Sequence, residues 1–217
     1  MQKIKDYSLY LIITEEYGEG RSSVEIAKAA IAGDVDIIQM REKDKPREEL
    51  VKLGKRLSRL CKSKNVKFIV NDDPLLTKEV NADGVHLGQE DAKRFSIEAS
   101  RRILGREKII GISTHTIEQF KEANEKDFDY AAFGPIFETK TKDYFVGADG
   151  IEEVLSVAKR PVFFIGGIDL SNVGDCLGRG AKNIALIRGI TEADDITERT
   201  REFKEAIKDG NKDKRQK

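Results

Sequence analysis

The chain has 217 residues, a length that suits one domain and lies near the lower end of the usual range for a (β/α)8 barrel. Its 39 lysine and arginine residues equal its 39 aspartate and glutamate residues, so net charge gives no argument for nucleic acid or membrane surfaces as partners. No apolar run approaches the roughly 18 to 20 residues of a membrane span, and the first residues show no signal-peptide pattern. We therefore expect a cytoplasmic protein.

Short apolar runs alternate with longer amphipathic stretches along the whole chain. The runs predict strands at residues 9–14, 37–41, 68–71, 84–87, 109–113, 130–134, 162–165 and 183–187. The stretches predict helices at residues 22–32, 47–63, 75–80, 96–104, 116–124, 150–158, 170–177 and 193–208. Alternation of this kind is typical of βα units around a parallel sheet.

Eight such units predict an α/β fold of the single (β/α)8 TIM-barrel type, with eight parallel strands. A doubly wound sheet would more often have five or six strands and an early glycine-rich turn, and no GxGxxG motif follows the first run. We assign residues 1–210 to this one domain. Residues 211–217 form a polar, basic tail that we expect to fray.

The active site of such a barrel lies at the carboxyl ends of the strands, so the residues after each run are the candidates. They are Gln39, Arg41, Lys43, Asn71, Asp72, His86, Gln89, Asp91, Ser113, His115, Gly134, Thr139, Thr141, Lys142, Gly166, Gly167 and Arg188. Few of them are residues that packing alone would select.

The segment QMREK ends the second predicted strand with three polar side chains at strand period. Gln39, Arg41 and Lys43 are therefore expected to share one direction. A planar guanidinium beside a lysine point charge suits a pyrophosphate. The alternative is a solvated strand end that pairs with Glu42 or Glu48.

Two carboxylates follow neighbouring predicted strands, Asp72 after the third and Asp91 after the fourth. Mg²⁺ is commonly bound by one or two carboxylates together with phosphate oxygens of a substrate, so this pair predicts a magnesium site. Each acid has a structural alternative as a helix or turn cap. Asp73, directly before Pro74, is the best candidate for a cap, which leaves Asn71 and Asp72 facing the site.

The fifth predicted strand ends in GISTHT. Ser113 is placed to donate to a phosphate oxygen, whereas Thr114 or Thr116 suits a helix cap. His115 is open between a hydrogen-bonded structural imidazole and an acid–base group. His86, inside an apolar strand end, is expected to be a core or supporting residue.

Two later segments predict a second anion site. The loop GPIFETKTK carries Thr139, Thr141 and Lys142 and suits a lid over phosphate, although a plain surface loop is the alternative. Gly167 follows the seventh strand and Arg188 the eighth, where many barrels bind phosphate through backbone N–H groups.

The segments QMREK, ND, GVHLGQED, GISTHT, GPIFETKTK and IGGI, taken together and in this order, resemble the thiamin-phosphate synthase family. The resemblance extends from Tyr10 to Ile190. It implies a barrel transferase that joins 4-amino-5-hydroxymethyl-2-methylpyrimidine diphosphate to 4-methyl-5-(2-phosphoethyl)thiazole and releases pyrophosphate. It also implies a dissociative mechanism in which the carbon–oxygen bond breaks before the thiazole nitrogen attacks.

The same resemblance implies roles for individual residues. The pyrimidine diphosphate would contact Gln39, Met40, Arg41, Glu42, Lys43, Asn71, Ser113 and Lys142, of which Arg41, Lys43, Ser113 and Lys142 would be catalytic. The thiazole phosphate would contact Thr139, Lys140, Thr141, Gly167, Ile187 and Arg188. One Mg²⁺ would be held by Asp72 and Asp91. The partners implied are small phosphorylated molecules, and the sequence carries no signal for an oligomeric state.

Two positions depart from the family pattern. Arg188 stands where the family usually has a small residue, most often serine, and could either add a bond to the phosphate or fill its pocket. Glu138 stands where proline is common in the synthase, and FET occurs in the related thiazole tautomerase. That tautomerase, which would use His115, is one alternative, and a catalytically silent paralogue that binds phosphate ligands is another. Retention of both Asp72 and Asp91 favours the synthase.

Overall fold

The predicted barrel is confirmed. The computed structural model describes residues 4–89, 95–139 and 144–212. Eight parallel strands close on themselves in sequence order, with β1 hydrogen-bonded to both β2 and β8. The strands are β1 (Leu9–Ile13), β2 (Ile37–Met40), β3 (Lys67–Asn71), β4 (Gly84–Leu87), β5 (Ile109–Thr114), β6 (Tyr130–Phe133), β7 (Val162–Ile165) and β8 (Asn183–Leu186). Each lies within one residue of its predicted bounds at both ends.

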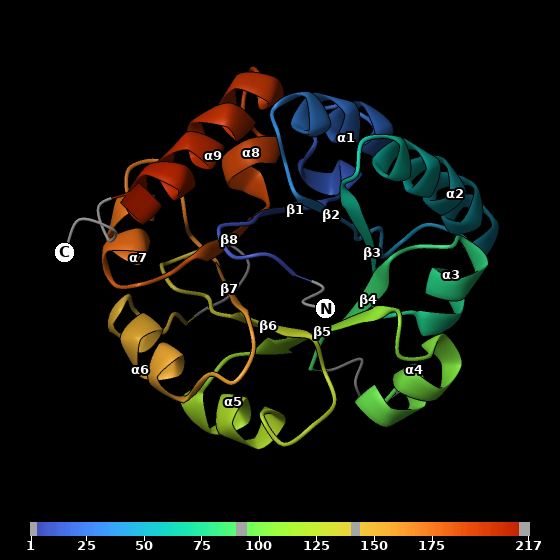
Figure 1. Cartoon of the computed structure of the whole chain (residues 1–217). Helices are drawn as coiled ribbons and strands as arrows, with labels where there is room; N and C mark the ends of the chain where they lie inside the picture. Colours follow the sequence, from blue (N-terminus) through green and yellow to red (C-terminus); the bar gives the residue numbers. More distant parts are fainter. Residues whose placement is uncertain (1–3, 90–94, 140–143, 213–217) are drawn as a thin grey trace.

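Helices form a ring outside these strands (Figure 1). They are α1 (Ser23–Ala32), α2 (Arg47–Ser63), α3 (Pro74–Glu79), α4 (Ile97–Leu104), α5 (Ile117–Ala123), α6 (Asp149–Val157), α7 (Val173–Gly178), α8 (Arg188–Thr191) and α9 (Ile196–Lys212), with a 3-10 turn η1 (Glu15–Tyr17) after β1. The predicted caps Asp73 and Thr116 accept hydrogen bonds from the first turns of α3 and α5. No helix in the described ranges combines the length and apolarity needed to cross a membrane.

Alternate residues of each strand pack into two separate apolar layers. In β1, Leu9, Leu11 and Ile13 belong to the layer between strands and helices, whereas Tyr10 and Ile12 belong to a smaller cluster inside the barrel. That inner cluster contains Tyr10, Tyr130 and Phe163, whose rings meet edge to face at centroid distances of 5.1–5.8 Å. The barrel is therefore filled by aromatic side chains beneath its rim.

The region after β8 differs from the prediction of one helix at residues 193–208. The short helix α8 begins directly at the end of β8, and α9 begins at Ile196. Asp195 accepts a hydrogen bond from the Glu198 amide at 3.0 Å, which starts a separate helix there. A four-residue helix is too short to show an amphipathic period, so the sequence pattern did not indicate it.

The helix predicted from residue 170 begins three residues later, at Val173. Asp169 accepts hydrogen bonds from the amide and hydroxyl of Ser171 at 2.8 and 2.6 Å, and it donates its own amide to Asn172. These local bonds hold the chain in a turn and delay the helix.

Candidate active site

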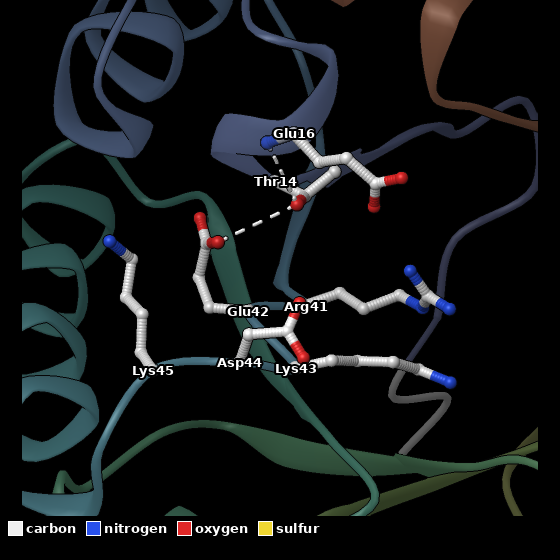
Figure 2. Close-up of a pocket in the computed structure, with 7 residues that line it drawn as sticks. All are labelled: Thr14, Glu16, Arg41, Glu42, Lys43, Asp44 and Lys45. Atoms are coloured by element: carbon white, nitrogen blue, oxygen red, sulfur yellow. Dashed lines mark hydrogen bonds between the residues drawn. The ribbon is translucent and has the colours of Figure 1, made fainter.

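Arg41 and Lys43 leave the end of β2 side by side and extend in the same direction, as Figure 2 shows. They line a pocket of about 260 Å³ together with Thr14, Glu16, Glu42, Asp44 and Lys45. Lys45 is paired with Glu15 at 2.7 Å, whereas Lys43 is exposed and makes no ion pair with any residue in the described ranges. The pocket therefore presents two adjacent cations on one wall.

Glu42, between these two cations in sequence, points the other way (Figure 2). Its carboxylate accepts hydrogen bonds from the Ser23 hydroxyl and, at 3.0 Å, from the Glu15 amide. Burial raises the pKa of Glu42, and the bonds from Ser23 and Glu15 partly oppose that rise. The Glu42 side chain thus connects the segment after β2 to α1 and η1.

Asp72 lies at the end of β3 in a left-handed backbone conformation, with φ of 60°. Its carboxylate accepts from the Gly88 amide at 2.7 Å and from the Asn71 side-chain amide. Its own amide donates to the His86 carbonyl at 2.7 Å. These contacts place the Asp72 carboxylate between the ends of β3 and β4, on the rim.

The donor chemistry at Asp72 fits a hard cation. The Asn71 and Gly88 groups that donate to its carboxylate are neutral N–H groups, and each carboxylate oxygen can accept more than one bond. Within the described ranges, no three His, Cys, Asp or Glu side chains gather as a metal site. Magnesium needs only one or two protein carboxylates, and the second candidate, Asp91, lies outside the described residues.

Ser113, at the end of β5, is tied to the barrel interior by a chain of buried polar groups. His86 Nε2 lies 2.9 Å from Ser113 Oγ, and His86 Nδ1 lies 3.0 Å from the Tyr130 hydroxyl. That hydroxyl is 2.8 Å from the Tyr10 hydroxyl, to which Gln39 Nε2 donates at 3.2 Å. Burial, assisted by nearby His115, lowers the pKa of His86 to about 4. His86 is therefore the supporting residue that its position in the strand indicated.

The remaining residues of the QMREK segment face different layers. Gln39 is buried among the inner side chains, and its Oε1 has no hydrogen-bond partner within the described part of the chain. Met40 is buried in the outer layer, so its side chain faces the helices and only its backbone can face the site. Of the five residues, Arg41 and Lys43 are those that bring positive charge to the rim pocket.

His115 holds its place through two hydrogen bonds. Its Nδ1 donates to the Gly134 carbonyl at 2.6 Å, and its amide donates to the Gln119 side chain at 2.8 Å. A carbonyl oxygen can only accept, so the Nδ1 proton is committed there. Nε2 alone is left for acid–base chemistry at this residue.

The loops after β6 and β7 pack closely against each other. Gly166 and Gly167 have φ of 97° and 67°, and a Cβ on Gly167 would come within 2.4 Å of the Glu138 carbonyl oxygen. Only glycine is compatible with both the backbone conformation and this approach. The approach brings Gly167 beside the segment that leads to Thr139. Lys140, Thr141 and Lys142 lie outside the described residues.

Arg188 is the first residue of α8, directly after Ile187. Its guanidinium stacks over the Tyr17 ring of η1, 4.2 Å from the centroid, and its Nε lies 3.3 Å from Glu192. The arginine side chain thus joins the β8 end to the β1 loop along the rim. These contacts with Tyr17 and Glu192 engage the Arg188 side chain at the start of α8.

Sequence reasoning missed Tyr10 and Tyr130, whose hydroxyls connect Gln39 to His86. Both read as apolar strand residues, because an aromatic ring in a buried strand is common. The available signal was the alternation of residues along each strand, which places both tyrosines on the inward side of the barrel. The anchoring of Glu42 by Ser23 was also missed, because the two residues lie on different units.

The structure is a closed parallel α/β barrel, with two cations, a carboxylate and a serine hydroxyl at the carboxyl ends of β2, β3 and β5, where enzymes of this fold place their active sites. Residues 9–190 match the family model for thiamine monophosphate synthase. The chain therefore belongs to the thiamine monophosphate synthase family and is a transferase.

Several known proteins are similar to this chain. The thiamine-phosphate synthase of Persephonella marina is 38% identical over 201 residues, which cover 92% of this chain and 95% of the relative. That of Dictyoglomus turgidum is 40% identical over 206 residues, covering 94% and 91%. The solved structure of a thiamine phosphate pyrophosphorylase from Pyrococcus furiosus matches with a TM-score of 0.86 at 32% identity, covering 94% of this chain and 96% of that one.

Proposed function

We propose that this chain joins 4-amino-5-hydroxymethyl-2-methylpyrimidine diphosphate to 4-methyl-5-(2-phosphoethyl)thiazole, giving thiamin phosphate and pyrophosphate. Family membership supports the reaction, and the parallel course of Arg41 and Lys43 is the observation that carries the site assignment. Two adjacent cations can stabilise the negative charge that develops on a diphosphate as it leaves.

The reaction needs no nucleophile from the protein. The bond between the pyrimidine methylene carbon and the bridging oxygen breaks, and its electron pair leaves with pyrophosphate. The thiazole nitrogen lone pair then forms the new carbon–nitrogen bond, so no proton is transferred between protein and substrate. The work of the chain is to stabilise the departing charge with Arg41, Lys43, Ser113 and Lys142 and to hold the two rings in line.

We assign the pyrimidine ring to the interior side of the rim pocket. The unpartnered Oε1 of buried Gln39 is a fitting acceptor for the ring amino group, because an unpaired buried acceptor gains most from a new donor. We assign the thiazole phosphate to Thr139, Lys140, Thr141, Gly167, Ile187 and Arg188. The first backbone amides of α8 have no acceptor within the helix and suit an anion.

We propose that Asp72 and Asp91 hold one Mg²⁺. When bound, the ion supplies charge neutralisation for the diphosphate. Hydrogen bonds from the Asn71 side chain and the Gly88 amide orient the Asp72 carboxylate for this role. The left-handed backbone conformation of Asp72 keeps the carboxylate on the rim.

The test is a reaction of the purified protein with both phosphorylated precursors, with Mg²⁺ and after its removal by chelator. We expect thiamin phosphate and pyrophosphate in equal amounts with Mg²⁺ and a loss of product without it. Absence of product with Mg²⁺ present would reject the proposed reaction. Product that forms at the same rate after chelation would reject the roles of Asp72 and Asp91.

A further inference from the structure

A continuous hydrogen-bonded chain runs through the barrel interior and ends at Ser113. It starts at Gln39 on β2 and passes through Tyr10 on β1, Tyr130 on β6 and His86 on β4. The four heavy-atom distances are 3.2, 2.8, 3.0 and 2.9 Å, all within hydrogen-bonding range. Five strands thus contribute one polar side chain each to a single line of groups.

The direction of the protons along this chain follows from its first member. Gln39 Oε1 is assigned above to the ring amino group of the pyrimidine, which leaves Nε2 to donate to the Tyr10 oxygen and directs the Tyr10 proton to Tyr130. Tyr130 then accepts from Tyr10 and donates to His86 Nδ1. A neutral imidazole whose Nδ1 accepts carries its proton on Nε2, which donates to Ser113 Oγ.

The opposite order would use the Gln39 oxygen that is assigned to the substrate. If Ser113 donated to His86 Nε2, Nδ1 would carry the proton and donate to Tyr130, and Tyr130 would donate to Tyr10. The Tyr10 hydroxyl proton would then find an acceptor only if the Gln39 amide turned its Oε1 toward Tyr10, which would withdraw that oxygen from the pyrimidine amino group. A doubly protonated imidazole would leave one tyrosine hydroxyl in the same position.

The position of Tyr130 in the chain is built into the neighbouring strand. Gly111 on β5 lies beneath its ring, and a Cβ there would come within 2.0 Å of Tyr130 Cζ and 2.3 Å of its hydroxyl oxygen. A side chain at residue 111 would therefore push the hydroxyl out of line between Tyr10 and His86. The absence of a side chain at this point permits the chain of bonds to close.

We propose that the chain from Gln39 through Tyr10, Tyr130 and His86 orients the Ser113 hydroxyl so that it donates toward the site. Because Oγ accepts from His86, its own proton is free to meet a phosphate oxygen. Tyr130 and His86 are then positioning residues, which act through Ser113 and do not touch the substrate. The proposal rests on the proposed function, in which Ser113 contacts the leaving diphosphate.

The proton positions can be read directly by ¹⁵N NMR of the imidazole rings, which distinguishes the two neutral tautomers. The chain has only two histidines, and a His115→Gln variant assigns the signals. We expect the proton of His86 on Nε2 and that of His115 on Nδ1, so each ring is a control for the other. A His86 ring with its proton on Nδ1, or on both nitrogens at neutral pH, would overturn the proposal.

A double-mutant cycle tests whether Tyr130 acts through Ser113. Tyr130→Phe removes only the hydroxyl, and we expect turnover to fall about tenfold, the scale of losing one oriented hydrogen bond to a charged group. In a Ser113→Ala background the same change should alter turnover by less than about twofold, because the donor is already gone. An equal effect in both backgrounds would overturn the proposal.

Phe163→Leu is the matched control for packing. Phe163 contacts both tyrosine rings but contributes no polar atom, so its shortening should lower stability and leave the His86 tautomer unchanged. A fall in turnover as large as that of Tyr130→Phe would attribute the effect to packing and reject the proposal. If the parent protein makes no product, the proposed function fails on its own. Product together with an Nδ1 proton on His86 rejects the hydrogen-bonded chain alone.

Discussion

Acid should destabilise this protein through His86. Burial lowers the pKa of this imidazole to about 4 from its ordinary value of 6.5, and the residue is only 6% exposed. The folded state thus keeps His86 neutral where the unfolded chain takes up a proton. Stability from this group is complete above pH 6.5 and is lost as the pH falls through the window from 6.5 to 4.

The size of the effect follows from the shift. The difference of 2.5 pKa units, 6.5 minus 4, corresponds to about 3 kcal/mol at 1.36 kcal/mol per unit. Between pH 7.5 and pH 4.5 we expect about 2–3 kcal/mol of this to be lost, since pH 4.5 lies just above the folded pKa.

Urea denaturation at the two pH values measures this loss, with carboxylates elsewhere contributing equally to parent and variant. His86→Gln removes the titrating ring. Between pH 7.5 and pH 4.5 the free energy of unfolding of this variant should therefore fall by about 2–3 kcal/mol less than that of the parent. Tyr130→Phe retains the imidazole and should keep a large part of the pH dependence. Equal pH dependence in the parent and His86→Gln would refute the assignment of a buried neutral imidazole.

Substitutions at Lys43, Glu42 and Gly111, two of them with a control variant, test the rim and the interior. In a steady-state assay, Lys43→Ala should slow turnover by roughly a hundredfold, because it removes a charge that faces the leaving group. Lys45→Ala is the control and should change turnover by less than about threefold, because the Lys45 charge is already paired with Glu15. Glu42→Ala should cost about 1–3 kcal/mol of unfolding free energy and lower turnover. Glu42→Gln should retain most of the stability and most of the turnover, because its amide oxygen can still accept from the Glu15 amide. Equal losses in the two variants would contradict the anchoring role of Glu42. Gly111→Ala should cost about 2–4 kcal/mol in thermal or urea unfolding, since its Cβ overlaps the Tyr130 ring, and a fully stable variant would show that the ring can move aside.

Local sequence patterns located most of the barrel and much of its rim. The predicted strand bounds were correct to within one residue, because turn residues on both sides of each short apolar run mark where the strand begins and ends. The cap at Asp73 was predictable for a similar reason, because a carboxylate before a proline at the first helical position satisfies the free amides of that turn. The candidate site followed from one rule, that the carboxyl ends of parallel strands meet on one rim.

Tertiary structure decided what depends on residues far apart in the chain. Glu42 looked like a rim charge, but Ser23, 19 residues earlier, draws it away from Arg41 and Lys43. Tyr10 and Tyr130 are 120 residues apart, and their hydroxyls meet only because closure of the barrel turns both strands inward. By itself, the sequence determined which residues stand at the strand ends, because the local pattern of apolar and turn residues marks each end. Which side chains face one another across the barrel depended on its closure, because side-chain contacts between distant strands leave no local pattern.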